Sequence, residues 1–234
     1  MRLACASSAF GRAFERGDLT QLEFVDACAR ELACDGIVLD AAHFPRLDND
    51  YLAQIKKMTT DLGLTVAAFA DDGLFLGNAD AMATALERSW RLGAPLVTAR
   101  LARENDVSWS DQIEAIGRAS ALAKGANVTI AVRNAPGTYA ASEHDCKRVT
   151  KEADSAWLRL ALQPGVLDLS AEPSKLAAHT VLLFCDAAQP PQQDRVESFA
   201  TFRGFLVLDR NEGDATLEKI RASIRIRSSY FVQG

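Results

Sequence analysis

Charged and polar side chains stand directly after short apolar runs at several points along the chain. The run TIAV (129–132) precedes Arg133 and Asn134, and the run LVTA (96–99) precedes Arg100. Other apolar runs are followed by a carboxylate, an imidazole or an amide: Asp40 and His43, Gln163, Asp186, and Asp209. Guanidinium groups bind carboxylate and phosphate anions, while carboxylates and imidazole move protons. These residue types predict a site for a small anionic molecule, provided that the fold gathers them.

The elements that must position these residues alternate between two kinds. Eight short, β-branched runs alternate with longer amphipathic segments, which predicts parallel strands joined by helices. Strands are expected near Leu3–Ala6, Gly36–Leu39, Thr65–Phe69, Leu96–Ala99, Val128–Val132, Leu158–Leu162, Val181–Phe184 and Phe205–Leu208. Helices are expected near 19–33, 49–62, 78–92, 109–124, 142–152, 173–178, 193–200 and 214–228.

This count predicts an α/β fold, a (β/α)8 TIM barrel. Eight units in 234 residues leave about 29 residues each, near the compact end of a fold that typically needs ~250. No linker or change of composition divides the chain, so one barrel domain over residues 1–234 is expected. An open doubly wound sheet is the alternative, and no Gly-rich nucleotide motif follows the first strand to support it.

Barrels of this type carry function at the carboxyl ends of their strands, where the polar residues lie in the sequence. Arg100 and Arg133 end neighbouring strands, so they could converge on one anion. Alternatively, each could pair with an aspartate of the barrel mouth, because charges near a core need partners. Asp40 and His43 follow the second strand, where they could contact a ligand or cap a loop.

Composition excludes several other classes of protein. The chain has 31 acidic and 26 basic residues, a net charge of −5 and no block of Lys or Arg, so no nucleic-acid partner is expected. Nothing approaches the ~18 continuous apolar residues of a membrane span. Five cysteines without a CxxC pair indicate reduced thiols in a cytoplasmic protein.

Two long stretches carry a resemblance to a known family. The stretch DGIVLDAAHFPRLDNDYLAQIKKMTTDLGLTVAAFA (35–70) resembles the second strand, second helix and third strand of the xylose-isomerase-like barrels, the sugar phosphate isomerase/epimerase superfamily. The stretch FRGFLVLDRNEGDATLEKIRASIRIRSSYF (202–231) is similar to that family's last strand and helix. The resemblance implies the same barrel, activity on a polyhydroxylated substrate, and a divalent Mn, Mg or Zn ion. Because barrels of this class often pair, a homodimer is among the assemblies that it implies.

The family's metal ligands are not retained in this sequence. The resemblance implies a Glu at the end of strand 5, where Arg133 stands, and an Asp with a nearby His after strand 6, where Gln163 and Val166 stand. A His or Asp expected near strand 7 falls at or beside Cys185, and only Asp209 keeps a carboxylate in place of the last Glu. Arg133 cannot bind a cation, since it has only donors and stays protonated. No metal or cofactor is therefore expected, and Arg133 is predicted to neutralise Asp209 or Asp186.

Two functions of different class follow. The first is an isomerase- or epimerase-like enzyme, with Asp209, Asp40 or His43 as acid and base. Its ligand contacts would be Arg133, Arg100, Asn134, Gln163 and Asp186. The second is a barrel that has lost catalysis and serves as a binding or protein-interaction module. A third reading, an abasic-site endonuclease, requires a metal cluster of His and acidic residues and a basic face, which the sequence lacks.

Overall fold

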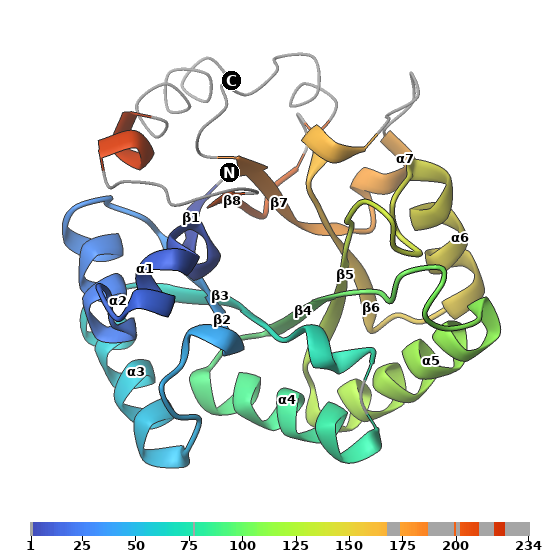
Figure 1. Ribbon diagram of the computed structural model, residues 1–234, viewed down its shortest axis with the longest axis horizontal. Helices are drawn as coiled ribbons and strands as arrows, with labels where there is room; N and C mark the ends of the chain where they lie inside the picture. The colour runs from blue at the N-terminus through green and yellow to red at the C-terminus, as the bar shows by residue number, and fades with distance from the viewer. Residues whose placement is uncertain are drawn as a thin grey trace.

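Eight parallel strands close into a barrel in the order of the chain, each hydrogen-bonded to the next and β8 to β1 (Figure 1). The computed structural model describes residues 2–76, 78–167, 174–186, 199, 202–210 and 218–222. The strands are β1 (Arg2–Ala6), β2 (Gly36–Asp40), β3 (Thr65–Ala70), β4 (Leu96–Arg100), β5 (Thr129–Arg133), β6 (Leu158–Leu162), β7 (Thr180–Asp186) and β8 (Phe205–Asp209).

Helices surround the barrel on the outside, where they cover the outward faces of the strands (Figure 1). They are α1 (Gly11–Arg16), α2 (Gln21–Arg30), α3 (Asn49–Asp61), α4 (Ala79–Leu92), α5 (Trp109–Ala126), α6 (Glu143–Ala153) and α7 (Ser174–Ala177). Residues 218–222 are also helical. Among the described residues, no helix combines the length and apolar character that crossing a membrane requires.

The predicted barrel is confirmed, and each predicted strand lies within about two residues of an observed one. Helix α1 was not predicted, because GRAFER is only six residues long and none of them is fully buried. The predicted helix over 193–200 lies almost wholly outside the described residues. The predicted helix over 214–228 is described only over 218–222, which is helical.

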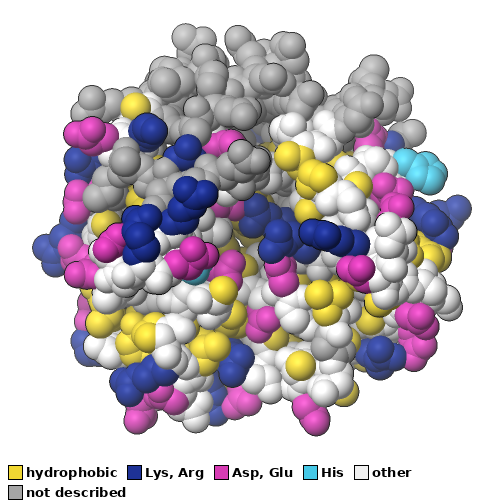
Figure 2. Space-filling model, viewed as in Figure 1, with side chains coloured by type: hydrophobic (Ala, Val, Ile, Leu, Met, Phe, Trp, Pro, Cys, Tyr) yellow, Lys and Arg dark blue, Asp and Glu magenta, His cyan; other side chains and the backbone are white. Residues whose placement is uncertain are grey.

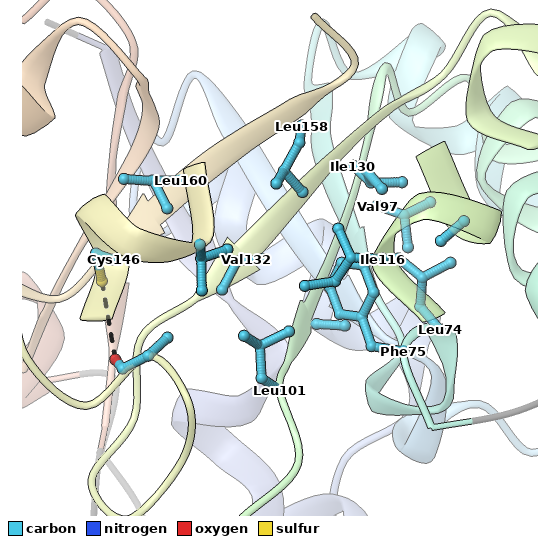
Figure 3. Close-up of a cluster of buried hydrophobic side chains, with 14 of the residues drawn as sticks. Leu74, Phe75, Val97, Leu101, Ile116, Ile130, Val132, Cys146, Leu158 and Leu160 are labelled. Carbon is cyan, nitrogen blue, oxygen red and sulfur yellow. Dashed lines mark hydrogen bonds between the residues drawn. The ribbon is translucent and has the colours of Figure 1, made fainter. Parts of the chain in front are cut away.

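The apolar side chains form layers on both faces of the barrel wall. Figure 3 shows one layer between the wall and the helices, where Val97, Ile130 and Leu160 of the strands pack with Ile116 of α5 and Cys146 of α6. A separate cluster fills the barrel interior. Its small members come mainly from the first six strands and its large ones from β7 and β8: Ala4, Ala6, Ala68, Ala131 and Ala161 against Leu182, Phe184 and Phe205.

Short 3-10 turns follow four of the strands directly and shape the mouth of the barrel. They are η1 (Ser7–Phe10), η2 (Ala41–His43), η3 (Asp72–Leu74) and η4 (Pro164–Val166), after β1, β2, β3 and β6. Asp40 caps η2, because its Oδ1 accepts a 2.9 Å hydrogen bond from the Ala42 N–H. Asp71 caps η3 in the same way through the Gly73 N–H at 3.0 Å. These turns hold the residues after the strands close to the barrel opening.

Candidate functional site

The charged residues that the sequence singled out end neighbouring strands at one edge of the barrel. Arg100 of β4 is the register partner of Arg133 of β5, and Asp186 of β7 is the partner of Asp209 of β8. Asp40 ends β2. Because parallel strands share one carboxyl end, these side chains belong to one mouth. Figure 2 shows Lys and Arg side chains beside Asp and Glu side chains near the middle of this face.

The central contact of the mouth is a buried ion pair. Arg133 Nη2 donates to Asp209 Oδ2 at 2.5 Å, and the Asp209 side chain is 1% exposed while that of Arg133 is 20% exposed. Ser8 Oγ and the Arg210 N–H both donate to Asp209 Oδ1 at 2.7 Å. The Arg133 guanidinium also lies 4.2 Å from the centre of the Phe184 ring. Both carboxylate oxygens of Asp209 are thus occupied, and its charge is neutralised by Arg133.

Arg100 has its own carboxylate partner outside the centre of the mouth. Its Nε donates to Asp72 Oδ2 at 2.7 Å, its Nη2 contacts the same oxygen, and its backbone N–H donates to Oδ1 at 2.9 Å. The two side chains are 56% and 45% exposed. Burial alone would raise the pKa of Asp72, but the hydrogen bonds and charge of Arg100 outweigh it and lower that pKa. The two strand-end arginines therefore each bind a separate aspartate in this structure.

The Ser7 hydroxyl bridges the backbone of Asp40 and the side chain of His43. The Asp40 N–H donates to Ser7 Oγ at 2.9 Å, and Ser7 Oγ lies 2.9 Å from His43 Nδ1. The His43 ring stacks on Phe14 of α1, with centroids 4.7 Å apart and planes 5° apart. Burial raises the pKa of Asp40, although the Ala42 N–H and the nearby His43 lower it in part.

Burial also lowers the pKa of His43, against the opposing charges of Asp40, Glu15 and Asp209. The carboxyl and the imidazole are therefore both shifted toward their neutral forms. These shifts bring the two pKa values closer to each other, which eases proton transfer between the two groups, and perturbed pKa values of this kind are common at functional sites.

Asn134 and Gln163 join the ends of β5 and β6. Asn134 Nδ2 donates to the Gln163 carbonyl at 3.2 Å, and the Gln163 N–H donates to Asn134 Oδ1 at 2.6 Å. Both residues are buried. The Asn134 amide therefore fixes the spacing of two strand ends, and its predicted role as a ligand contact stays a prediction.

The donors around Asp209 do not fit a divalent cation. Its oxygens already accept three hydrogen bonds, and a guanidinium stands beside it where a second carboxylate would be needed. Over the residues that the structure describes, no group of three or more His, Cys, Asp or Glu side chains is arranged to hold a metal ion.

The sequence did not single out Ser7, Ser8, Asp72 or Phe184 as site residues. The signal for the serines was their position directly after β1, and for Asp72 its position two residues after β3. Nothing in the sequence distinguished Phe184 from the other apolar residues of its strand.

Solved structures resemble this chain over nearly its full length, although no family model and no curated protein sequence matches it. A probable 3-DHS dehydratase, AsbF from Bacillus anthracis, is 12% identical with a TM-score of 0.78, covering 97% of this chain and 99% of its own. D-psicose 3-epimerase from Clostridium cellulolyticum H10 is 12% identical with a TM-score of 0.73, at 97% and 90% coverage. An IOLI protein with a bound zinc atom is 12% identical with a TM-score of 0.72, at 100% and 97% coverage. The chain has the xylose-isomerase-like TIM-barrel fold.

Proposed function

We propose that this chain binds a small polyhydroxylated or anionic molecule at the barrel mouth and that Arg133 supplies the positive charge which a metal ion supplies elsewhere. The observation that carries the proposal is the buried Arg133–Asp209 pair, at 2.5 Å with Asp209 1% exposed. A guanidinium beside a buried carboxylate is held in one place, because leaving either charge unpaired there is costly. A fixed cation of this kind can receive a ligand oxygen without a metal.

Arg133 has donors left for that oxygen. Of its guanidinium nitrogens, only Nη2 takes part in a hydrogen bond with a described residue, and a guanidinium carries five N–H donors. Phe184 supports one face of the group, and the Arg133 side chain is 20% exposed, so part of the guanidinium side chain stays accessible. Preorganised donors of this kind stabilise negative charge that develops on an oxygen during a reaction.

Asp40 and His43 are the acid and base of the proposed reaction. The pKa of Asp40 is raised and that of His43 is lowered, so the two pKa values lie closer to each other than their ordinary values do. An isomerisation or epimerisation would begin when one of them removes the proton from a carbon next to a carbonyl. The electron pair of that bond then moves to the carbonyl oxygen beside Arg133. In an epimerisation, a proton returns to the other face of the same carbon. In an isomerisation, a proton is added to the former carbonyl carbon, and the hydroxyl proton of the first carbon moves to the oxygen beside Arg133 as the new carbonyl forms.

Asp209 takes a different part in this proposal from the one that its sequence position suggested. With Arg133, Ser8 and the Arg210 N–H on its two oxygens, it serves to position Arg133. The structural neighbours include a probable 3-DHS dehydratase and D-psicose 3-epimerase, and the second name agrees with the epimerisation proposed for this chain.

A binding module without catalysis is the second candidate. Both strand-end arginines already hold a carboxylate, and the Asn134 amide is engaged by Gln163. These internal bonds reduce the number of polar groups of the mouth that a substrate could use.

The first experiment measures metal content and proton exchange together. Protein purified without chelator is loaded in turn with Mn²⁺, Mg²⁺, Zn²⁺ and Fe²⁺, freed of excess ion and counted by mass spectrometry. We expect no stoichiometric ion. Sugars, sugar phosphates and sugar acids are then incubated with the protein in D2O with EDTA, and loss of C–H signals is followed by NMR. One ion per chain that disappears in Asp209→Asn would overturn the metal-free proposal.

Variants separate the enzyme from the binding module. Asp40→Asn and His43→Gln should abolish exchange while ligand binding remains, and Arg133→Lys should weaken both. The matched control is Arg30→Gln, which breaks an exposed Arg–Asp pair on α2 that lies outside the mouth. Binding without any exchange in the wild type would favour the module.

A further inference from the structure

The Ser7 hydroxyl is a buried group with two hydrogen-bond neighbours among the described residues. Ser7 is completely buried, and its Oγ accepts from the Asp40 N–H at 2.9 Å. The same oxygen lies 2.9 Å from His43 Nδ1. A hydroxyl has one donor and two acceptor positions, and a ring nitrogen of histidine can donate or accept. The direction of the Ser7–His43 bond therefore decides which nitrogen of neutral His43 carries the proton.

The Asp40 N–H contact determines that direction. Because an N–H can only donate, Ser7 Oγ is already an acceptor at this contact. If His43 Nδ1 also carried a proton, Ser7 Oγ would accept twice, and its own hydrogen would have no acceptor in the described part of the chain. A buried donor without an acceptor is costly. The Ser7 hydroxyl therefore donates to a bare Nδ1, and neutral His43 carries its proton on Nε2.

The surroundings of His43 hold its ring and leave Nε2 available. The ring is stacked on Phe14, which fixes its plane. Position 11, beside Nε2, is a glycine, and even a Cβ there would come within 3.6 Å of that nitrogen. Nε2 makes no hydrogen bond with a described residue, and His43 is only partly buried. The Nε2–H group is therefore a donor left for an oxygen of a ligand.

Three carboxylates act on the charge of His43. They belong to Asp40 after β2, Glu15 of α1 and Asp209 of β8, and each favours the imidazolium. Burial outweighs them and lowers the pKa of His43. The Ser7 contact acts in the same direction as burial, because a proton on Nδ1 would displace the hydroxyl hydrogen from its acceptor. At pH 7 most of the His43 population is therefore neutral.

Asp40 offers a proton acceptor that neutral His43 lacks. Asp40 Oδ1 accepts from the Ala42 N–H, whereas Oδ2 accepts no hydrogen bond from a described residue. The bare nitrogen of His43, by contrast, is already occupied by Ser7. A neutral imidazole with a free N–H can polarise a substrate oxygen, and a carboxylate can remove a proton from carbon. The two side chains are thus suited to different tasks.

We propose that Ser7 is a positioning residue that holds neutral His43 in its Nε2–H form, so that His43 donates a hydrogen bond to a substrate oxygen and Asp40 removes the proton from carbon. The electron pair of the C–H bond moves to the carbonyl oxygen, and the proton stays on Asp40 until a proton returns to the substrate. His43 remains neutral throughout. The division of tasks rests on the proposed function of the mouth, whereas the protonated nitrogen of His43 can be measured without a substrate.

The first test measures the ¹⁵N signals of the imidazole rings at pH 8 in protein labelled at histidine. The chain has three histidines, and the His43 signals are those that disappear in His43→Gln. Nε2 should have the shift of a protonated ring nitrogen and Nδ1 that of a bare one. Ser7→Ala should increase the fraction of the Nδ1–H form and raise the pKa of His43.

Ser8→Ala is the matched control, because the neighbouring hydroxyl donates to Asp209 and does not contact His43. It should leave the His43 signals unchanged. A wild-type His43 with its proton on Nδ1 would overturn the proposal. His43 signals that are the same in Ser7→Ala and the wild type would also overturn it.

The second test identifies the base from the pH dependence of C–H exchange in D2O, with sugars, sugar phosphates and sugar acids as substrates. With Asp40 as the base, the rate should rise over the same pH range in the wild type and in Ser7→Ala, although the pKa of His43 has moved. A rise that moves with the pKa of His43 would make His43 the base and overturn the proposal. An Nε2–H form in a wild type that exchanges no substrate would support the role of Ser7 and count against the proposed function.

Discussion

Two arginines at adjacent strand ends illustrate how burial changes the consequence of one interaction. Arg100 and Arg133 are register partners, and each binds an aspartate. The aspartate of Arg100 is 45% exposed, whereas that of Arg133 is 1% exposed. The exposed Arg100–Asp72 pair contributes little to the free energy of unfolding, because solvent and salt screen it. The second pair cannot lose one member without leaving a charge buried. Two arginines at paired register positions therefore differ in role: one forms an exposed ion pair, and the other neutralises a buried carboxylate.

Removing Arg133 should have the largest effect. Arg133→Gln leaves the Asp209 carboxylate buried with only neutral donors, which should lower the free energy of unfolding by about 3–5 kcal/mol. Urea unfolding measures it, and the double variant Arg133→Gln/Asp209→Asn should recover a substantial part of the loss. A loss below about 1 kcal/mol would mean that the pair behaves like the exposed one.

Removing the Ser8 hydroxyl should have the second largest effect on the free energy of unfolding. Ser8→Ala removes a 2.7 Å hydrogen bond to the buried Asp209 and should cost about 1.5–3 kcal/mol. The same unfolding assay measures it, and Ser110→Ala on the surface of α5 serves as the control. If the Ser8 and Ser110 variants lost the same amount, Asp209 would not depend on its hydroxyl donor.

Ionisation of Asp40 and ionisation of Asp72 should change the free energy of unfolding in opposite directions. The pKa of Asp40 is raised, so its ionisation costs stability as pH rises through that pKa, and Asp40→Asn should stabilise the protein at pH 7. The pKa of Asp72 is lowered, so its ionised form adds stability above its ordinary pKa of 3.8, and Asp72→Asn should destabilise the protein at pH 7. Both differences should shrink as pH falls below 3.8. Urea midpoints at pH 3.5, 5 and 7 test the signs, and a shared sign would contradict the assignment.

Breaking the exposed pair should have the smallest effect. Arg100→Gln should cost less than about 1 kcal/mol. The difference should disappear in 1 M NaCl, where screening acts within about 3 Å. A loss at high salt similar to that of Arg133→Gln would remove the distinction between the two arginines.

The sequence predicted the barrel well because each strand is a short apolar run and most of the helices carry clear caps and stripes. It also placed Arg133 beside a carboxylate, but it could not choose between Asp186 and Asp209. These two are register partners at the ends of adjacent strands, so only side-chain burial decides. Arg100 was assigned to the same mouth, yet its partner Asp72 lies on a turn whose geometry no periodicity reveals.

The buried amide of Gln112 on α5 was not predictable for a related reason. Gln112 reads as an ordinary polar residue of an amphipathic helix, and nothing in its neighbours marks its amide as buried. Gln112 is 1% exposed, and its Oε1 accepts a hydrogen bond from the Ala102 N–H in the segment that follows β4. Loop paths of this kind depend on tertiary contacts that a single sequence does not display.

Phe184 links the packing of the barrel interior to the charge at its mouth. It packs in the barrel interior among the alanines of other strands, and one face of its ring supports the Arg133 guanidinium. The face of an aromatic ring is electron-rich, so it favours a cation and disfavours a carboxylate. A Glu at position 133 would then be repelled both by the ring and by Asp209. We therefore expect the effects of substitutions at positions 133, 184 and 209 to depend on one another, and a carboxylate at position 133 to be poorly tolerated while Phe184 and Asp209 remain and no cation is bound.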